Sequence, residues 1–157
     1  MNAKQALQIK LEKVIGTKPQ IVALFQFLRR REYNISNSLL PTFYSHSKFV
    51  KNHPYRAWYL IKLNNLYIGS SYVMESNCIG ISLSDNYSVL PLVYELISKK
   101  HKPLKEIKSV RPSYFFINIA PKNKKLEHQL IKIGATKIQT TYSLESIIKT
   151  KANNVKN

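Results

Sequence analysis

The chain has 157 residues, which is the usual size of a single domain and enough to bury roughly 70% of the surface that the unfolded form exposes. Hydrophobic residues make up 44% of it, and ten Tyr, six Phe and one Trp are among them, so a disordered chain is excluded. No apolar run approaches the ~20 residues needed to cross a bilayer, and the first residues carry no apolar signal segment. With Cys78 as the single cysteine there is no internal disulfide, and we expect a cytoplasmic protein.

The chain is strongly basic, because 25 Lys and Arg stand against 8 Asp and Glu and give a formal charge of +17. A field of this sign attracts polyanions and accelerates their association. It does not distinguish nucleic acid, coenzyme A, nucleotide sugars and anionic membrane surfaces from one another. A coding bias toward Lys, Asn and Ile explains the same composition equally well.

The first half of the chain predicts one strand, two helices and three further strands. Alternation over 7–14 is typical of a half-buried strand, and Pro19 begins a helix with apolar residues at helical spacing that ends at Arg29–Arg31. A short helix over 42–52 follows and ends before Pro54. The aromatic and β-branched runs 55–63, 66–74 and 78–83 predict consecutive antiparallel strands, joined by turns at Asn64-Asn65 and at 75–77.

The second half predicts a helix over 88–100, a basic stretch over 99–111, a buried strand over 114–119, a helix over 123–133 and a last strand over 137–144. Gly134 follows this last helix, where a residue with positive φ commonly ends a helix. We therefore expect one domain over 1–148 and a basic, polar tail over 149–157.

This order of elements resembles the GCN5-related N-acetyltransferase superfamily, and in particular its relatives that act on amino sugars. The resemblance runs from Tyr44 to Leu144 and rests on the hairpin around Asn64-Asn65 and on the stretch Ser113-Tyr-Phe-Phe-Ile-Asn118-Ile-Ala-Pro-Lys-Asn123 with its following helix and Gly134. It implies an α/β (α+β) fold, with a mixed, twisted sheet of about six strands and helices on both faces. The strands over 78–84 and 114–119 would be parallel neighbours that splay apart at their carboxyl ends.

The resemblance also implies a site for acetyl-CoA between these two strands. A backbone N–H near Leu83 and Ser84 would stabilise the oxyanion, and the pantetheine arm would pair with 81–84 and 116–119. The glycine-rich pyrophosphate loop of the family is absent here, because the corresponding stretch 84–91 has no glycine and carries Asp85, so acetyl-CoA binding is expected to be weak or lost. The residues expected to bind the cofactor are Leu83, Ser84, Asn86, Tyr87, Ser88, Asn118, Lys122 and Asn123, with Lys124 and Lys125 able to neutralise phosphates from across the crevice.

Proton transfer must use residues other than those typical of the family, because Leu130 stands where a tyrosine acid is often found and the fourth strand has no acidic base. His46 is the candidate base and Tyr142 the candidate acid, although packing on a helix and on a strand explains both residues as well. Tyr44 and Trp58 are candidates for contact with the substrate, against the alternative that aromatic pairs stabilise the sheet. Asn118 and Asn123 would either bind the cofactor or cap the helix that follows them.

Two functions follow from these observations. The first is an acyl-CoA-dependent N-acyltransferase that moves an acetyl group to a primary amine of a small molecule or sugar. The second is a catalytically degenerate member that binds an anionic partner such as RNA through the basic segments Arg29–Arg31, Lys99–Lys102 and Lys122–Lys125. No zinc spacing, Walker motif, nucleophile elbow or dinucleotide fingerprint competes with them, and no metal site is predicted.

Overall fold

The computed structural model describes residues 8–33, 35, 39–85 and 87–144. Its elements are β1 (Ile9–Lys13), α1 (Lys18–Arg30), α2 (Phe43–Lys51), β2 (Ala57–Leu63), β3 (Leu66–Val73), β4 (Ile79–Leu83), the short 3₁₀ helix η1 (Tyr87–Val89), α3 (Leu90–Lys100) and α4 (Lys124–Lys132). The expected tail over 149–157, the domain limit at 148 and the expected cofactor ligand Asn86 lie outside the described residues.

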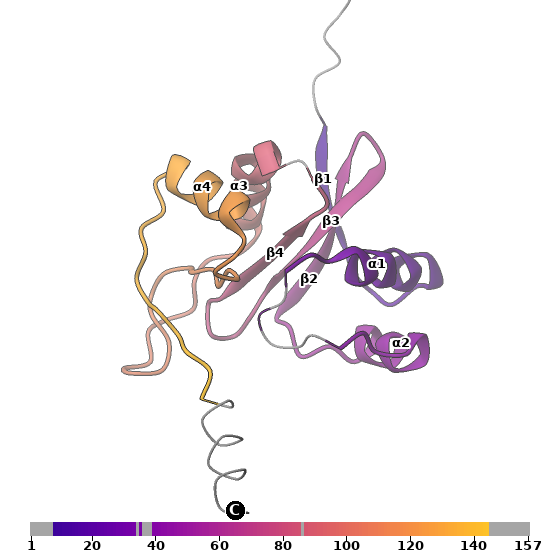
Figure 1. Cartoon of the computed structure of the whole chain (residues 1–157), viewed down its shortest axis with the longest axis horizontal. Helices are drawn as coiled ribbons and strands as arrows, with labels where there is room; N and C mark the ends of the chain where they lie inside the picture. Colours follow the sequence, from indigo (N-terminus) through magenta and orange to yellow (C-terminus); the bar gives the residue numbers. More distant parts are fainter. Residues whose placement is uncertain (1–7, 34, 36–38, 86, 145–157) are drawn as a thin grey trace, which may run out of the picture.

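The four strands form one antiparallel sheet in the order β1-β2-β3-β4 (Figure 1). The hairpin between β2 and β3 turns through Asn64 and Asn65, whose φ angles are 48° and 70°. Two successive positive φ angles match the right-handed twist of the strands, and asparagine tolerates them better than most residues. The predicted antiparallel amino-terminal half, including this turn, is confirmed.

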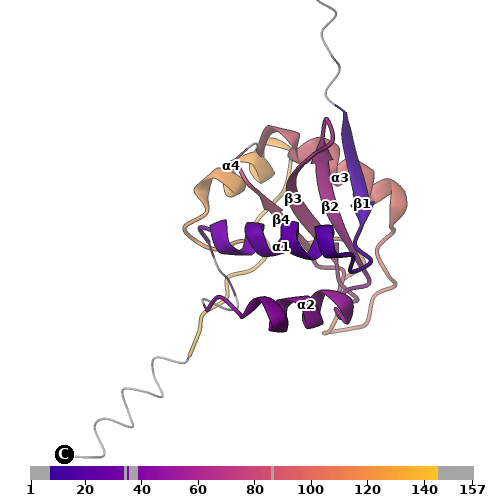
Figure 2. The ribbon, with the colours of Figure 1, turned by 90° about the vertical axis from the view of Figure 1, so that its right-hand side faces the viewer.

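Helices cover both faces of the sheet, as expected. Helices α1 and α2 lie on one face, where Leu24, Val50 and Leu60 belong to one buried cluster. Helix α3 lies on the other face, where Val93 and Ile97 pack against Ile61 (Figure 2). Leu60 and Ile61 are both fully buried but face opposite layers, because successive side chains of a strand point to opposite sides.

The pairing of β3 with its neighbours depends on Gly69. Its register with β2 shifts by one residue between Ile61 and Lys62, which makes a β-bulge. A Cβ at Gly69 would lie 2.1 Å from the backbone oxygen of Ser82 on β4. Only glycine allows the two strands to approach this closely.

Two expected strands are missing from the sheet, so the expectation of about six strands is wrong for the described residues. The stretch 114–119 makes a single parallel bridge, Cys78 with Phe116, and the stretch 137–144 makes no strand and is exposed along its whole length. The alternation of Ile138, Tyr142 and Leu144 with polar residues shows which side chains would share a face. A segment becomes a strand of a sheet only if it also pairs with the edge of a neighbouring strand. The fold is therefore a four-stranded sheet whose β4 edge is largely open.

Candidate functional site

The open edge of β4 begins at the bridge between Cys78 and Phe116. Phe116 N–H donates to the backbone oxygen of Asn77 at 3.2 Å, and Ile79 N–H donates to the backbone oxygen of Phe116 at 2.7 Å. The described residues contain no further pairing between β4 and the 117–119 stretch. The two segments are therefore parallel neighbours at one point, as predicted, and are unpaired toward the carboxyl end of β4.

This edge supplies backbone donors for a ligand. Ile79 N–H points to the Phe116 side, and since the backbone alternates, the N–H groups of Ile81 and Leu83 point the same way. Ser84 differs, because its N–H donates to the Ile68 oxygen at 2.9 Å and its hydroxyl to the same oxygen at 3.1 Å. Two residues were expected to provide the oxyanion donor. The N–H of Leu83 points out of the sheet, whereas the N–H of Ser84 is already bonded to Ile68 on β3.

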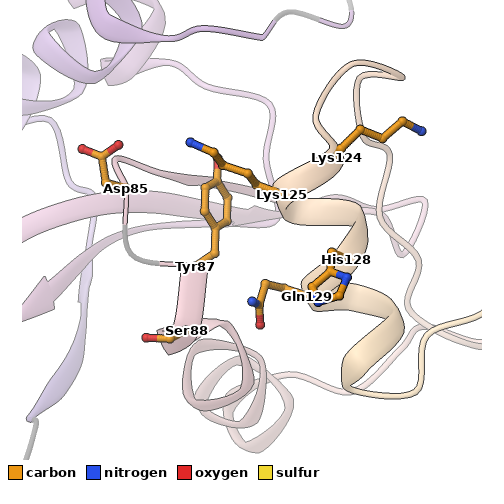
Figure 3. Close-up of a pocket in the computed structure, with 7 residues that line it drawn as sticks. All are labelled: Asp85, Tyr87, Ser88, Lys124, Lys125, His128 and Gln129. Carbon is orange, nitrogen blue, oxygen red and sulfur yellow. The ribbon is translucent and has the colours of Figure 1, made fainter.

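A crevice of about 580 Å³ opens beyond the carboxyl end of β4 (Figure 3). One wall is the segment after β4 and the start of the helical stretch that follows it; the other is the amino-terminal half of α4. Its lining residues are Asp85, Tyr87, Ser88, Lys124, Lys125, His128 and Gln129. The Lys125 side chain extends toward the expected cofactor residue Tyr87, whereas the Lys124 side chain points away from Tyr87 and Ser88 (Figure 3).

The charges in the crevice are mixed. Asp85 is the one carboxylate among the lining residues, and Lys124 donates to the Glu127 carboxylate at 2.6 Å. This hydrogen bond, followed by the charge of Lys124, lowers the pKa of Glu127. Lys125 makes no ion pair in the part of the chain that the structure describes. Lys125 is therefore the ammonium group with most to gain from a phosphate.

Helix α4 presents this wall because Asn123 begins it. The Asn123 side-chain oxygen accepts the Leu126 N–H at 3.1 Å, and the residue is 9% exposed. Gly134, with φ of 91°, ends the helix, as predicted. The side chain of Asn123 thus acts as a helix cap, and it orients the residues of the crevice through the helix that it caps.

Asn118 lies beside Cys78, where its side-chain amide donates to the Cys78 sulfur at 3.6 Å. Burial raises the pKa of the Cys78 thiol, while hydrogen bonds from Asn118 oppose that change. The cysteine residue is 5% exposed. Cys78 is consequently a neutral, enclosed group at the point where β4 and the 114–119 stretch meet.

The two candidate proton-transfer residues lie elsewhere. His46 is 6% exposed on α2 and contacts Phe25 of α1 at 5.3 Å between ring centroids. Burial lowers the pKa of His46, a backbone hydrogen bond with Ile21 opposes this, and its Nε2 has no described hydrogen-bond partner. Tyr142 is 81% exposed on the stretch 137–144, which is not the expected strand.

The remaining candidates divide between core and surface. Trp58 is 7% exposed and packs against Phe49 and Tyr55, whereas Tyr44 is exposed on α2. Lys122 is exposed and is not among the residues that line the crevice. His128 and Gln129, which do line it, were not predicted. Their spacing from Lys124 and Lys125 on one helix face was the signal that the sequence offered.

Comparison with known proteins confirms the fold. No family model matches the sequence, and no curated protein does. Among solved structures, a possible acetyltransferase from Clostridium difficile is similar, with a TM-score of 0.54 at 8% identity over 86% of this chain and 95% of that one. An aminoglycoside acetyltransferase from an uncultured soil metagenomic sample, in complex with sisomicin, gives 0.51 at 13% identity over 86% and 93%. Its complex with trehalose gives 0.52 at 12% identity over the same shares.

Proposed function

We propose that the protein is an acyl-CoA-dependent N-acyltransferase that acts on a primary amine of a small molecule or sugar. The observation that carries this proposal is the continuity of the open β4 edge with the basic crevice. The outward N–H groups of Ile81 and Leu83 lead directly to a cavity lined by Lys124 and Lys125. A thioester whose long polar arm leads to a pyrophosphate has the chemistry to occupy both.

The residues of the site fit each part of such a donor. The peptide-like arm of coenzyme A offers carbonyl oxygens to the open N–H groups of β4, and its phosphates suit the ammonium groups at the start of α4. The Leu83 N–H would stabilise the oxyanion that forms when an amine attacks the thioester carbonyl. When bound, acetyl-CoA supplies the acetyl group and the thiolate leaving group, and the protein supplies position and a dipole.

Asp85 sets the expected strength of binding. Its carboxylate lines the same crevice and repels a phosphate, and the stretch 84–91 that contains it has no glycine. We therefore propose that the donor binds weakly in the unmodified protein. One of the similar solved proteins is named an aminoglycoside acetyltransferase, and an amino sugar is accordingly the first acceptor to test on this chain.

The roles of His46 as base and Tyr142 as acid remain proposals that turnover measurements test. His46→Gln and Tyr142→Phe should each lower kcat with little change in the dissociation constant of acetyl-CoA if these groups transfer protons. A His46 variant that lowers stability but not kcat would assign the residue to the packing of α1 on α2 instead. The cytoplasmic location is likewise part of the proposal; no helix in the described part of the chain is long and apolar enough to cross a membrane.

Calorimetric titration with acetyl-CoA tests the site through three variants. Lys125→Glu should weaken binding about tenfold or more, because it replaces an attraction to phosphate by a repulsion. Lys132→Glu is the matched control, since it makes the same charge change on the same helix outside the crevice. Asp85→Asn should strengthen binding by about three- to tenfold, as removal of one repulsion of roughly 1 kcal/mol predicts.

Equal effects of Lys125→Glu and Lys132→Glu would show that only the overall charge attracts the cofactor. No binding to the wild type or to Asp85→Asn, together with no thioester consumption with a panel of amino sugars, would refute the transferase. In that case the second function, a binding module for an anionic partner, would stand alone.

A further inference from the structure

A second concentration of positive charge surrounds His101, at the carboxyl end of α3. Lys13 on β1 is paired in register with Tyr59 on β2, and the Tyr59 hydroxyl lies 2.8 Å from His101 Nε2. Residues paired directly across a sheet share a face, so Lys13 and His101 lie on the same side of it. Arg56, which precedes β2, donates through both terminal nitrogens to the Lys102 oxygen at 3.0 Å. We call Lys13, Arg56, Lys100 and Lys102, around His101, the His101 cluster.

The cations of the His101 cluster are close enough to act on one another. Burial lowers the pKa of His101, and the charges of Arg56, Lys100 and Lys13 lower it further. None of the three ion pairs in the described part of the chain includes a member of the cluster. Lys102 also donates to the Ser98 oxygen at 3.3 Å, so the end of α3 satisfies part of its charge. The cluster as a whole lacks a compensating carboxylate in these contacts.

The His101 cluster and the crevice lie at different places on the molecule. Strands β2 and β4 run in the same direction because each is antiparallel to β3. Arg56 precedes β2, whereas the crevice follows β4, and the two sites are therefore at opposite ends of the sheet. In Figure 2 helix α4 lies to the left of the sheet, and the loop that leaves α3 runs down its right-hand side.

The charge continues from the cluster along the chain. The stretch 99–111 contains six Lys or Arg residues against one acidic residue, Glu106. Within it, residues 101–106 form neither helix nor strand, and 107–111 fold into a tight turn closed by the bridge between Ile107 and Arg111. Arg111 also donates to the Lys105 oxygen at 2.9 Å, which ties the turn to the preceding segment. Cations arranged along a surface segment suit a linear polyanion better than a single small anion.

We propose that the His101 cluster binds the sugar-phosphate backbone of nucleic acid. Ammonium and guanidinium groups would neutralise successive phosphates and release their counterions, and the binding would be largely independent of sequence. The surface keeps Lys100 and Lys102 of the basic segments expected from the sequence and adds Lys13 and Arg56. It does not include the expected segments that end α1 and begin α4. Lys99 and Lys124 of the expected segments are already paired with Glu95 and Glu127.

Two triple variants of equal charge test the proposal by fluorescence anisotropy, with a single-stranded RNA and a DNA duplex as separate probes. The cluster variant is Lys13→Glu, Lys100→Glu and Lys102→Glu, whose side chains are exposed. The control variant is Lys10→Glu, Lys48→Glu and Lys132→Glu, which are also exposed and lie outside the cluster. Circular dichroism and urea unfolding of both variants establish that they are folded before binding is compared.

The cluster variant should bind single-stranded RNA about 50-fold more weakly than the wild type at about 0.15 M salt, and its salt slope should fall by about 2, since each lost phosphate contact contributes about 0.7 on single strands. On the duplex the slope should fall by nearly 3, at about 0.9 for each contact. The control variant should lose less than a tenth of this effect. Excess acetyl-CoA should not displace the nucleic acid, because the crevice is elsewhere.

Equal losses in the two variants would overturn the proposal, since the overall charge would then be sufficient. Displacement by acetyl-CoA would also overturn it, because it would place the nucleic acid in the crevice. Binding of the wild type to vesicles with anionic headgroups, without binding to either nucleic acid, would assign the cluster to a membrane surface. None of these outcomes depends on whether the protein transfers acetyl groups.

Discussion

Substitution of Asn77 should be among the most destabilising changes in this protein. Asn77 is fully buried in the turn between β3 and β4, and its side chain joins the sheet to the loop after α3. Its amide nitrogen donates to the Leu104 oxygen at 2.9 Å and to the Pro112 oxygen at 2.7 Å, and its oxygen accepts the Leu104 N–H at 2.7 Å. Its φ is 67°, in the left-handed region.

Asn77→Ala removes these three hydrogen bonds and places a less tolerant residue at a positive φ. Each hydrogen bond is worth about 1 kcal/mol net, and the backbone conformation costs alanine roughly 1 kcal/mol more than asparagine. The expected loss is about 3–5 kcal/mol of the free energy of unfolding, a large share of the roughly 5–15 kcal/mol typical of a domain. Urea unfolding followed by the fluorescence of Trp58, the single tryptophan, measures it.

Two further variants of Asn77 separate the contributions. Asn77→Gly also loses the hydrogen bonds but accepts the positive φ, so it should be about 1 kcal/mol more stable than Asn77→Ala. A stability of Asn77→Gly within about 0.5 kcal/mol of the wild type would refute the hydrogen-bond argument. Asn77→Asp would place a carboxylate against the carbonyl oxygens of Leu104 and Pro112, and its stability relative to the wild type should therefore rise as pH falls and the carboxyl becomes protonated.

Three other predictions concern the sheet and its edge. Hydrogen bonds from Gln20, Lys62 and Tyr67 lower the pKa of Glu12 to about 2, so the stability that these bonds give above the unfolded pKa of about 4.5 should be lost as pH falls toward 2. The unfolding midpoints of the wild type and of Glu12→Gln should therefore converge over this pH range, and a constant difference between them would contradict the prediction. Gly69→Ala should fail to fold or lose about 3 kcal/mol or more, because its Cβ would strike a backbone oxygen of β4; thermal unfolding near that of the wild type would show that the strands can separate. Cys78 should react with a maleimide far more slowly than a free thiol at neutral pH and become reactive in urea, because it is buried and its pKa is raised; fast labelling of the folded protein would contradict its enclosure.

The sequence by itself determined the helices, the four strands of the sheet and their order along the chain. The aromatic and β-branched runs 55–63 and 66–74 specified two strands, Asn64-Asn65 specified their turn, and Asn123 and Gly134 specified the ends of α4. These features depend on φ preferences, caps and periodicity, which act within a few residues. The resemblance of the element order to the acetyltransferases extended the prediction to the fold, which the solved structures confirm.

Tertiary structure decided which groups meet. The turn at 75–77 gave no sign that Asn77 would be buried and would hold Leu104 and Pro112, because those partners are 27 and 35 residues away. The patterns of 114–119 and 137–144 predicted strands but could not show whether an edge would be available to pair with them. Asp85 and Lys125 share a crevice, and Lys13 and Lys100 lie near His101, only because the sheet and its helices bring distant segments together. Contacts of this kind depend on packing over the whole chain, and local sequence carries no record of them.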